Sequence, residues 1–260
     1  MKRRDFIKTM SVASAFTLPG FSNRLVSSPY SLPDTNNNDQ SLPLWKGFNL
    51  LNKFKPDTQA AFDEKDFELI ADWGFNFVRI PLSYWCWSSE EDWYSVDEKV
   101  LKEIDGAVDL AHQYNLHINL NFHRVPGYCI NNPQPLPTNI FEDEEPLKAC
   151  QFHWKLFAER YRGIPSSQLS FNLINEAPSV EDEKYDRVAR RLISTIREAD
   201  PGRLIIVDGK DVGRTPLMTV TDIPNIIQSG RGYDPMLISH FRATWPGVKV
   251  LMDFPEEELS

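Results

Sequence analysis

Short apolar segments alternate along this chain with longer segments in which apolar residues recur every three or four positions. The short segments span residues 47–51, 75–80, 116–122, 168–174 and 203–209, and a sixth lies within 223–241. The longer segments span residues 63–74, 97–115, 146–163 and 181–200. Their spacing is that of amphipathic helices, while the short segments have the length of strands. Strands that alternate with helices predict a parallel sheet covered by helices.

The composition of the predicted strands narrows the fold class. They are almost continuously apolar, which is typical of strands buried on both faces. Polar or charged residues follow at their carboxyl ends, where α/β folds place their functional sites. A (β/α)8 barrel and a doubly wound sheet both meet this description. No GxGxxG motif follows the first strand, which disfavours dinucleotide binding, but the alternation alone does not choose between the two folds.

The first 43 residues differ from the rest of the chain. Residues 1–21 join a basic head to an apolar stretch that is too short to span a bilayer. This order resembles a twin-arginine export signal, so we expect export to the periplasm or the cell exterior. A disordered basic tail is the alternative. Residues 22–43 are rich in Ser, Asn and Pro, which predicts a polar linker.

Charge and cysteine content exclude several classes of partner. The net charge is −9, with acidic and basic residues mixed along the chain. Because no basic stripe is present, we expect neither nucleic acid nor an anionic membrane as a partner. The cysteines Cys86, Cys129 and Cys150 form no CxxC motif, and no HExxH motif occurs. We expect buried thiols, of which export would allow one pair to oxidise, and no dedicated metal site.

Polar side chains that could act on a substrate end four of the predicted strands. They are Arg79, His123, the pair Asn175 and Glu176, and His240 in the sixth segment. An arginine at the end of an apolar run is costly unless it is paired, so we expect a carboxylate beside Arg79. A carboxyl group in a partly apolar pocket can hold a proton near neutral pH, which suits Glu176 to acid catalysis. Each residue alone fits a solvated or structural position, but four at one edge favour a site.

The segments around these residues resemble family 5 of the glycoside hydrolases, the cellulase-like enzymes. In order, the matching segments are GFNLLNKF, DWGFNFVRIP, NLNFHRVPG, NLINEAP and ISHF. Their order and approximate spacing agree from residue 45 to about residue 245, and NLINEAP is the most specific of them. The resemblance implies a (β/α)8 barrel over residues 44–260 that hydrolyses β-linked glycans with retention of configuration. It also implies a monomer without a metal or organic cofactor.

The resemblance further implies a role for each matching residue. Glu176 is the catalytic acid/base, and Asn175 binds the hydroxyl next to the reacting carbon. Arg79 supports the nucleophile. His123 and His240 line the subsite around the cleaved bond.

The chain departs from the family pattern toward its C-terminus. Retention requires a second carboxyl about 5 Å from the first, and the family places it on a glutamate that ends the seventh strand. Only about six β/α units are visible, and the tail after Trp245 offers at most one further strand, at 247–252. The glutamates at 256–258 form a polar run after a proline. We therefore expect a barrel of six to seven units, truncated at the C-terminus, that lacks its nucleophile and shows little or no retaining hydrolysis.

Two further departures concern aromatic residues. No tryptophan is a candidate for the one that usually ends the eighth strand. Many relatives carry a tyrosine two residues after the sixth-strand histidine, but Arg242 stands two residues after His240.

Aromatic side chains in the predicted loops could still hold sugar rings through their faces. Tyr84, Trp85 and Trp87 follow the second strand, and Trp245 follows the sixth segment. Packing beneath a loop is an equal alternative for each of them.

Two other functions fit the same residues. A non-catalytic carbohydrate-binding relative would hold an oligosaccharide without cleaving it. A barrel enzyme of different chemistry would use His123 and His240 with a metal, although no acidic ligand pair accompanies them at recognisable spacing.

Overall fold

The computed structural model describes residues 42–130, 136–241 and 243. The chain divides into Met1–Pro43 and Leu44–Ser260, and every described helix and strand belongs to the second part. The predicted export signal and nearly all of the predicted linker lie outside the described residues. So do Trp245, the further strand expected at 247–252 and the glutamates at 256–258.

Six parallel strands, one short antiparallel strand and six helices make up the described fold. The strands are β1 (Gly47–Asn49), β2 (Phe77–Ser83), β3 (His117–Val125), β4 (Tyr128–Cys129), β5 (Leu169–Asn172), β6 (Leu204–Asp208) and β7 (Ile226–Ser229). The helices are α2 (Glu64–Asp72), α3 (Glu98–Gln113), α4 (Glu144–Arg160), α5 (Asp182–Ala199), α6 (Lys210–Gly213) and α7 (Met236–Ser239), with short 3-10 turns at Pro56–Thr58, Tyr84–Cys86 and Met218–Val220.

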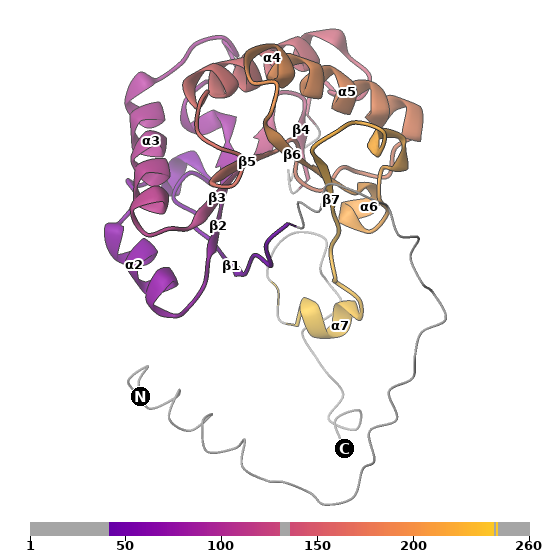
Figure 1. Cartoon of the computed structure of the whole chain (residues 1–260). Coiled ribbons are helices and arrows are strands. Elements are labelled where there is room, and N and C mark those ends of the chain that lie inside the picture. The colour runs from indigo at the N-terminus through magenta and orange to yellow at the C-terminus, as the bar shows by residue number, and fades with distance from the viewer. Residues whose placement is uncertain (1–41, 131–135, 242, 244–260) are drawn as a thin grey trace, which may run out of the picture. The chain divides into compact units, whose positions relative to one another are not determined.

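The parallel strands lie in the sheet in the order in which they occur along the chain. That order is β1-β2-β3-β5-β6-β7, and β4 pairs with β3 in antiparallel fashion. The long helices α2, α3, α4 and α5 cover one side of the sheet in the same sequence (Figure 1). A doubly wound sheet would reverse its order at a switch point. The unreversed order is that of a (β/α)8 barrel, so the topology decides the alternative that the alternation of elements left open.

Capping residues set the starts of α2 and α3. The Asp63 carboxylate accepts a hydrogen bond of 3.0 Å from the backbone N–H of Lys65, and Asp97 accepts one of 2.9 Å from Lys99. Each bond satisfies a donor that the first helical turn leaves without a partner. After α2, Gly74 adopts a φ of 78°, a conformation that a residue without a side chain reaches at no steric cost.

The strand β3 is buried on both faces, as its composition predicted, but the two faces differ in polarity. Its apolar residues alternate with His117, Asn119 and Asn121. Phe122 stacks on Trp154 of α4 with ring centroids 3.8 Å apart, which places the apolar set against the helices. The polar set lies on the inner face.

The inner polar residues of β3 hydrogen-bond across to β5. Ser170 Oγ contacts His117 Nε2 at 2.8 Å and accepts from Asn119 Nδ2 at 2.9 Å. Asn121 Nδ2 donates to Asn172 Oδ1 at 2.9 Å. Neighbouring strands therefore supply partners for most of these inner polar groups, although Asn121 Oδ1 has none among the described residues.

β2 runs past the point where the sequence predicted its end. Pro81 lies within the strand, paired in register with Asn121 of β3. On its other side β1 has already ended, since Asn49 pairs with Arg79. No strand therefore faces Pro81 on that side, so the N–H that proline lacks would have made no hydrogen bond in the sheet. Arg79 consequently lies inside the strand rather than at its end.

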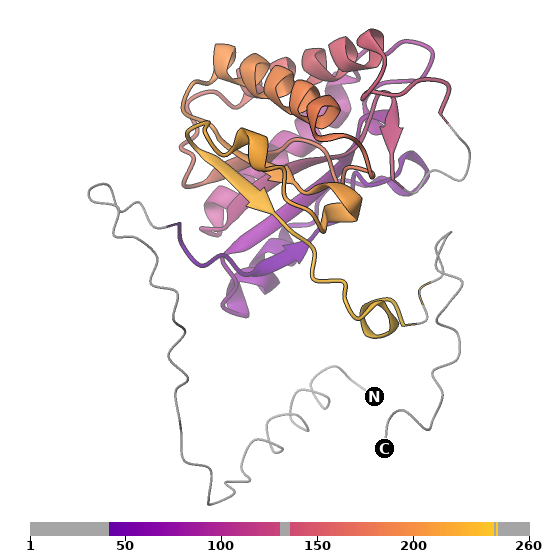
Figure 2. The same cartoon turned by 90° about the vertical axis from the view of Figure 1, so that its right-hand side faces the viewer.

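The sixth strand ends earlier than the ISHF segment predicted. β7 closes at Ser229, and His240 follows the short helix α7. Figure 2 shows α7 beyond the end of β7, away from the parallel strands. The assignment of His240 to a strand end is therefore wrong, and the residues that follow Ser229 take that position.

Truncating the stacked pair in the outer core tests this packing. We expect Phe122→Ala to lower the free energy of unfolding by about 3–5 kcal/mol, because Phe122 is 1% exposed and its loss leaves a cavity. Urea denaturation would measure the change. The control Met218→Ala removes a side chain that is 65% exposed and should cost no more than about 0.5 kcal/mol. Equal effects of the two substitutions would contradict the packing described.

Candidate active site

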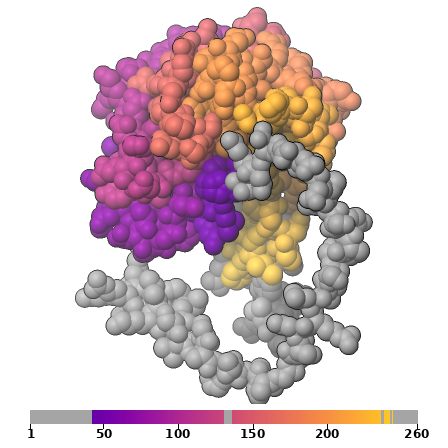
Figure 3. Space-filling view, viewed as in Figure 1, coloured from indigo at the N-terminus to yellow at the C-terminus, as the bar shows by residue number. Residues whose placement is uncertain are grey.

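The carboxyl ends of β5, β6 and β7 bring three charged side chains together. Glu176 follows β5, Asp208 is the last residue of β6, and Arg231 follows β7. These strands are neighbours in the sheet. Figure 3 shows the chain after β7 (yellow) on the same face of the molecule as the chain around β1 (indigo). Because the carboxyl ends of neighbouring parallel strands meet at one edge of the sheet, these three side chains lie there together.

The backbone of Glu176 is held on both sides in an unusual conformation. Its φ is 48°, in the left-handed region that costs a residue with a side chain about 1–2 kcal/mol. Its N–H donates to Asp208 Oδ2 at 3.0 Å, and its carbonyl accepts from the Tyr128 hydroxyl at 2.5 Å. These two bonds hold the turn that directs the carboxylate.

The Glu176 carboxylate is anchored through one of its oxygens. Oε1 accepts a hydrogen bond of 2.8 Å from Arg231 Nε, and a second from the Tyr233 hydroxyl. Burial and the bond to Glu176 raise the pKa of Tyr233 to about 12, so this hydroxyl keeps its proton and remains a donor near neutral pH. The Glu176 side chain is 13% exposed, which leaves it accessible at the edge of the sheet.

Asp208 is a wholly buried carboxylate with both oxygens engaged. Oδ1 accepts from Asn172 Nδ2 at 2.9 Å, while Oδ2 accepts from the Glu176 N–H and from Arg231. A buried charge requires a counter-charge, and Arg231 supplies it. Burial acts to lower the pKa of Arg231, but Asp208 and Glu176 outweigh burial and the pKa is raised.

Arg79 contacts amides, so the expectation of a carboxylate partner is wrong within the described residues. Its guanidinium donates to Asn175 Oδ1 at 2.9 Å and to Asn172 Oδ1 at 3.2 Å. Burial lowers the pKa of Arg79 to about 10, partly offset by the field of Asp208. The group stays charged at neutral pH, and its cation faces the site without a carboxylate in contact.

Two side chains at the site hold polar atoms without a hydrogen-bond partner among the described residues. The unpartnered atoms are the two ring nitrogens of His123 and the Nδ2 of Asn175. Burial, and then the charges of Arg124, Arg79 and Arg231, lower the pKa of His123 to about 3. Asn175 lies close enough to raise it slightly, but not in hydrogen-bonding geometry. A neutral imidazole and a free amide N–H₂ are suited to the hydroxyl groups of a ligand.

The remaining predicted site residues lie in different environments. His240 packs edge-on against Tyr233 with ring centroids 4.9 Å apart, and Tyr233 in turn donates to Glu176. Tyr84 and Trp87 are buried, and Trp87 Nε1 donates to His153 Nδ1 at 3.2 Å. Of the two alternatives left open for Tyr84 and Trp87, their burial favours packing in the core. Trp85 is half-buried.

Sequence reasoning missed Asp208, Arg231 and Tyr233. Asp208 lies in the predicted strand 203–209, so the rule that singled out the other strand ends also applies to it. Arg231-Gly232-Tyr233 places a tyrosine two residues after a basic strand-end residue. This is the spacing expected of the sixth strand, with arginine in place of histidine.

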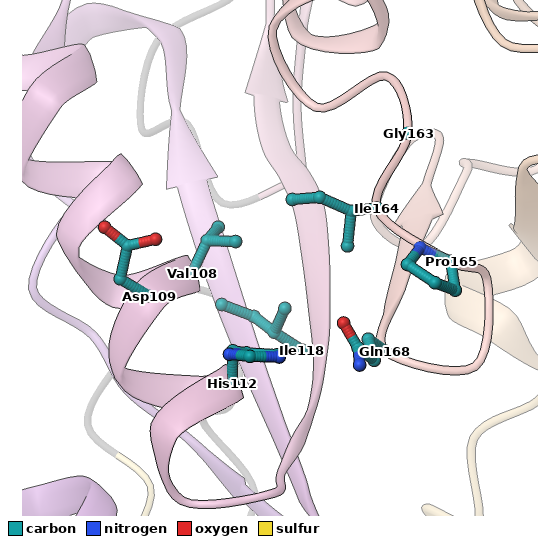
Figure 4. A pocket seen from close by; sticks show the side chains of 8 residues that line it. All are labelled: Val108, Asp109, His112, Ile118, Gly163, Ile164, Pro165 and Gln168. Carbon is teal, nitrogen blue, oxygen red and sulfur yellow. The ribbon is translucent and has the colours of Figure 1, made fainter.

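One cavity in the described part of the chain lies apart from these site residues. A cavity of about 290 Å³ lies between α3, β3 and the loop before β5 (Figure 4). It is at the amino ends of the strands, since Ile118 is the second residue of β3 and Gln168 precedes β5. No group of three His, Cys, Asp or Glu side chains that could hold a metal occurs among the residues described. The same residues include no helix long and apolar enough to cross a membrane.

The buried histidines predict how stability depends on pH. Burial lowers the pKa of His123 to about 3 and those of His117 and His153 to about 4, against about 6.5 for an exposed histidine. Below about pH 6.5 the unfolded chain binds protons that the folded chain does not, so stability is lost as pH falls. We expect His123→Gln to shrink the loss of urea midpoint between pH 7 and pH 5. A His123 ring resonance that titrates near pH 6.5 would contradict this environment.

Two proteins with similar sequences carry the names of enzymes that cleave glycans. Endoglucanase C of Acetivibrio thermocellus is 27% identical over 209 residues, which cover 76% of this chain and 60% of that protein. Cellodextrinase A of Ruminococcus flavefaciens matches with the same identity and coverage. The chain thus spans about 60% of the length of these curated relatives.

Solved structures agree with the fold. A crystal structure of a glycoside hydrolase superposes with a TM-score of 0.73 at 34% identity, covering 80% of this chain and 65% of that one. Thermotoga maritima Cel5A in complex with cellobiose superposes with a TM-score of 0.63 at 23% identity, over 76% of this chain and 62% of that one. The second likeness is one of fold alone. The family model for cellulase, glycosyl hydrolase family 5, matches residues 35–244, and the chain therefore belongs to that family.

Proposed function

We propose that this site acts on β-linked glucan chains, with Glu176 as the acid/base of retaining hydrolysis. The observation that carries the proposal is the Glu176 carboxylate, anchored through Oε1 and partly exposed at the carboxyl edge of the sheet. The names of the relatives, an endoglucanase and a cellodextrinase, support glucan as the substrate class. The unpartnered polar atoms of His123 and Asn175 fit the hydroxyl groups of a sugar.

The chemistry assigned to Glu176 has two proton transfers. The carboxyl first gives its proton to the glycosidic oxygen as the bond between that oxygen and the anomeric carbon breaks. The carboxylate then takes a proton from the water that releases the sugar from a glycosyl-enzyme. The anchor on Oε1 fixes the direction of both transfers, because a proton donor must lie within hydrogen-bonding reach of its acceptor.

The nucleophile of the retaining reaction is not among the described residues near Glu176. Asp208 is the nearby carboxylate, but it is 0% exposed and both its oxygens accept hydrogen bonds. It cannot reach an anomeric carbon without breaking those bonds. A second candidate function follows from this observation, namely the binding of a glycan without its cleavage.

An external nucleophile separates the role of Glu176 from the question of which group acts as the second carboxylate. We expect azide to cleave 4-methylumbelliferyl β-cellobioside in the presence of this chain, giving the α-glycosyl azide and the free coumarin. Glu176→Gln should lower that rate by about 100-fold or more, since general acid catalysis contributes about 10²–10⁴-fold. Fluorescence of the released coumarin is the measurement.

Binding supplies the control for this experiment. The Glu176→Gln chain should bind cellotetraose with the affinity of the unmodified chain, measured by calorimetry. Equal azide-dependent rates in the two chains would refute the acid/base assignment. Oligosaccharide binding without any azide-dependent cleavage would support the non-catalytic alternative instead.

We also propose that the N-terminal segment directs export by the twin-arginine route. The basic head with Arg3 and Arg4 ahead of a short apolar stretch supports this. Replacing both residues by lysine should leave the protein in the cytoplasm of a bacterium that has a twin-arginine translocase. Cell fractionation and immunoblotting would show this, and unchanged export of the double variant would count against the route.

A further inference from the structure

We infer that Arg231, fixed in place by Asp208, is a positioning residue that orients the Glu176 carboxyl group for proton transfer. The inference rests on the proposed acid/base role of Glu176. It concerns residues that neither motif resemblance nor strand-end position had singled out.

The first observation is the bridging geometry of the guanidinium. Arg231 Nε donates to Glu176 Oε1 at 2.8 Å, and the neighbouring NH2 group donates to Asp208 Oδ2. A planar guanidinium presents these two donors in a fixed fork. The position of one carboxylate therefore sets the position of the other.

The second observation is that Asp208 cannot move to follow its partner. It is 0% exposed, and Asn172 and the Glu176 N–H hold its two oxygens from β5 and the turn after it. Asp208 thus fixes the acid/base residue twice, once through the backbone N–H and once through Arg231. The same carboxylate stabilises the left-handed turn at Glu176.

The third observation is that the fold leaves a slot for the arginine. The Arg231 N–H donates to the Gly213 carbonyl at 2.9 Å. A Cβ at Gly213 would lie 2.5 Å from Arg231 Cγ, so the stem of the arginine packs where a larger residue would meet it. NH1 is held by Ser229 Oγ at 2.7 Å. The side chain is consequently fixed along its length.

The arrangement assigns different roles to the two oxygens of Glu176. Arg231 and Tyr233 both donate to Oε1, so among the described contacts Oε2 is the oxygen left to exchange the proton. In azide-driven cleavage, azide bonds to the anomeric carbon as its bond to the leaving oxygen breaks. The leaving oxygen keeps the electron pair of that bond and takes the proton from Oε2. Oε1 then carries the developing negative charge toward the Arg231 cation.

The test compares leaving groups, because the rate gained from proton donation falls as the leaving group becomes less basic. 2,4-Dinitrophenolate leaves without protonation, whereas methylumbelliferone needs more help from an acid. With azide present, we expect Arg231→Gln to lower the rate on methylumbelliferyl cellobioside about 10- to 100-fold, and the rate on the dinitrophenyl substrate less than about 3-fold. Arg231→Lys keeps the charge without the fork, so it should restore part of the loss.

Arg231→Gln alone leaves Asp208 buried without its counter-charge, and that chain could fail to fold. The double variant Asp208→Asn/Arg231→Gln removes both charges and should show the same leaving-group pattern. Arg190→Gln is the matched control, since Arg190 pairs with Asp186 and Asp222 on the outer surface. It should leave both rates unchanged.

The outcomes separate the inference from the function on which it rests. Equal losses on the two substrates in the double variant, or no loss on either, overturn the positioning role of Arg231. If Glu176→Gln itself shows no leaving-group dependence, the acid/base assignment fails, and the inference fails with it. A loss confined to the methylumbelliferyl substrate in both Glu176→Gln and the double variant supports both.

Discussion

The buried charge of Asp208 is the constraint on which the arrangement of the site depends. A carboxylate without solvent is costly unless hydrogen bonds and a counter-charge surround it. Here the partners come from neighbouring strand ends, namely an amide of β5, the backbone of Glu176 and the guanidinium of Arg231. The hydrogen bonds and the ion pair of Asp208 therefore fix the ends of β5, β6 and β7 relative to one another. The direction of the Glu176 side chain follows from it.

Other buried polar side chains on the inner face of the sheet also need hydrogen-bond partners. Asn172 links Asp208 to Asn121 and Arg79, while Ser170 joins His117 and Asn119 one layer below. These side chains hydrogen-bond to partners on neighbouring strands, so the register of the parallel sheet and the pairing of these interior groups determine one another. On the outer face, apolar packing such as that of Phe122 on Trp154 holds the helices. Stability and site geometry thus rely on opposite faces of the same strands.

Much of this fold could be predicted from the sequence, because helical and strand periodicities are local properties. The order of elements and the barrel topology followed from alternation and from family resemblance, and both hold. The ends of strands were less predictable. The strand predicted over residues 75–80 continues through Pro81, because β1 ends first and the N–H that proline lacks has no partner to lose. The inner polarity of β3 is visible in the alternation of HINLNFH, where polar and apolar residues occupy opposite faces of the strand.

Site residues could be predicted from the sequence where their position at a strand end identifies them. They were harder to predict where their role depends on a contact with another strand. Glu176 and Asn175 lie where their motif places them, although their roles remain proposals. Arg231 stands near the strand end where the resemblance implies a histidine, whereas His240 follows α7. The partnership of Arg231 with Asp208 depends on a tertiary contact between two strands. No local pattern contains that contact.

A crystal structure of this chain with a cello-oligosaccharide bound across the site tests the account most directly. It should show a glycosidic oxygen within hydrogen-bonding distance of Glu176 Oε2, while Oε1 remains on Arg231. Sugar hydroxyls should meet the ring of His123 and the amide of Asn175. A sugar bound away from Glu176, or a carboxylate turned so that Oε1 faces the glycosidic oxygen and Arg231 is released, would contradict it.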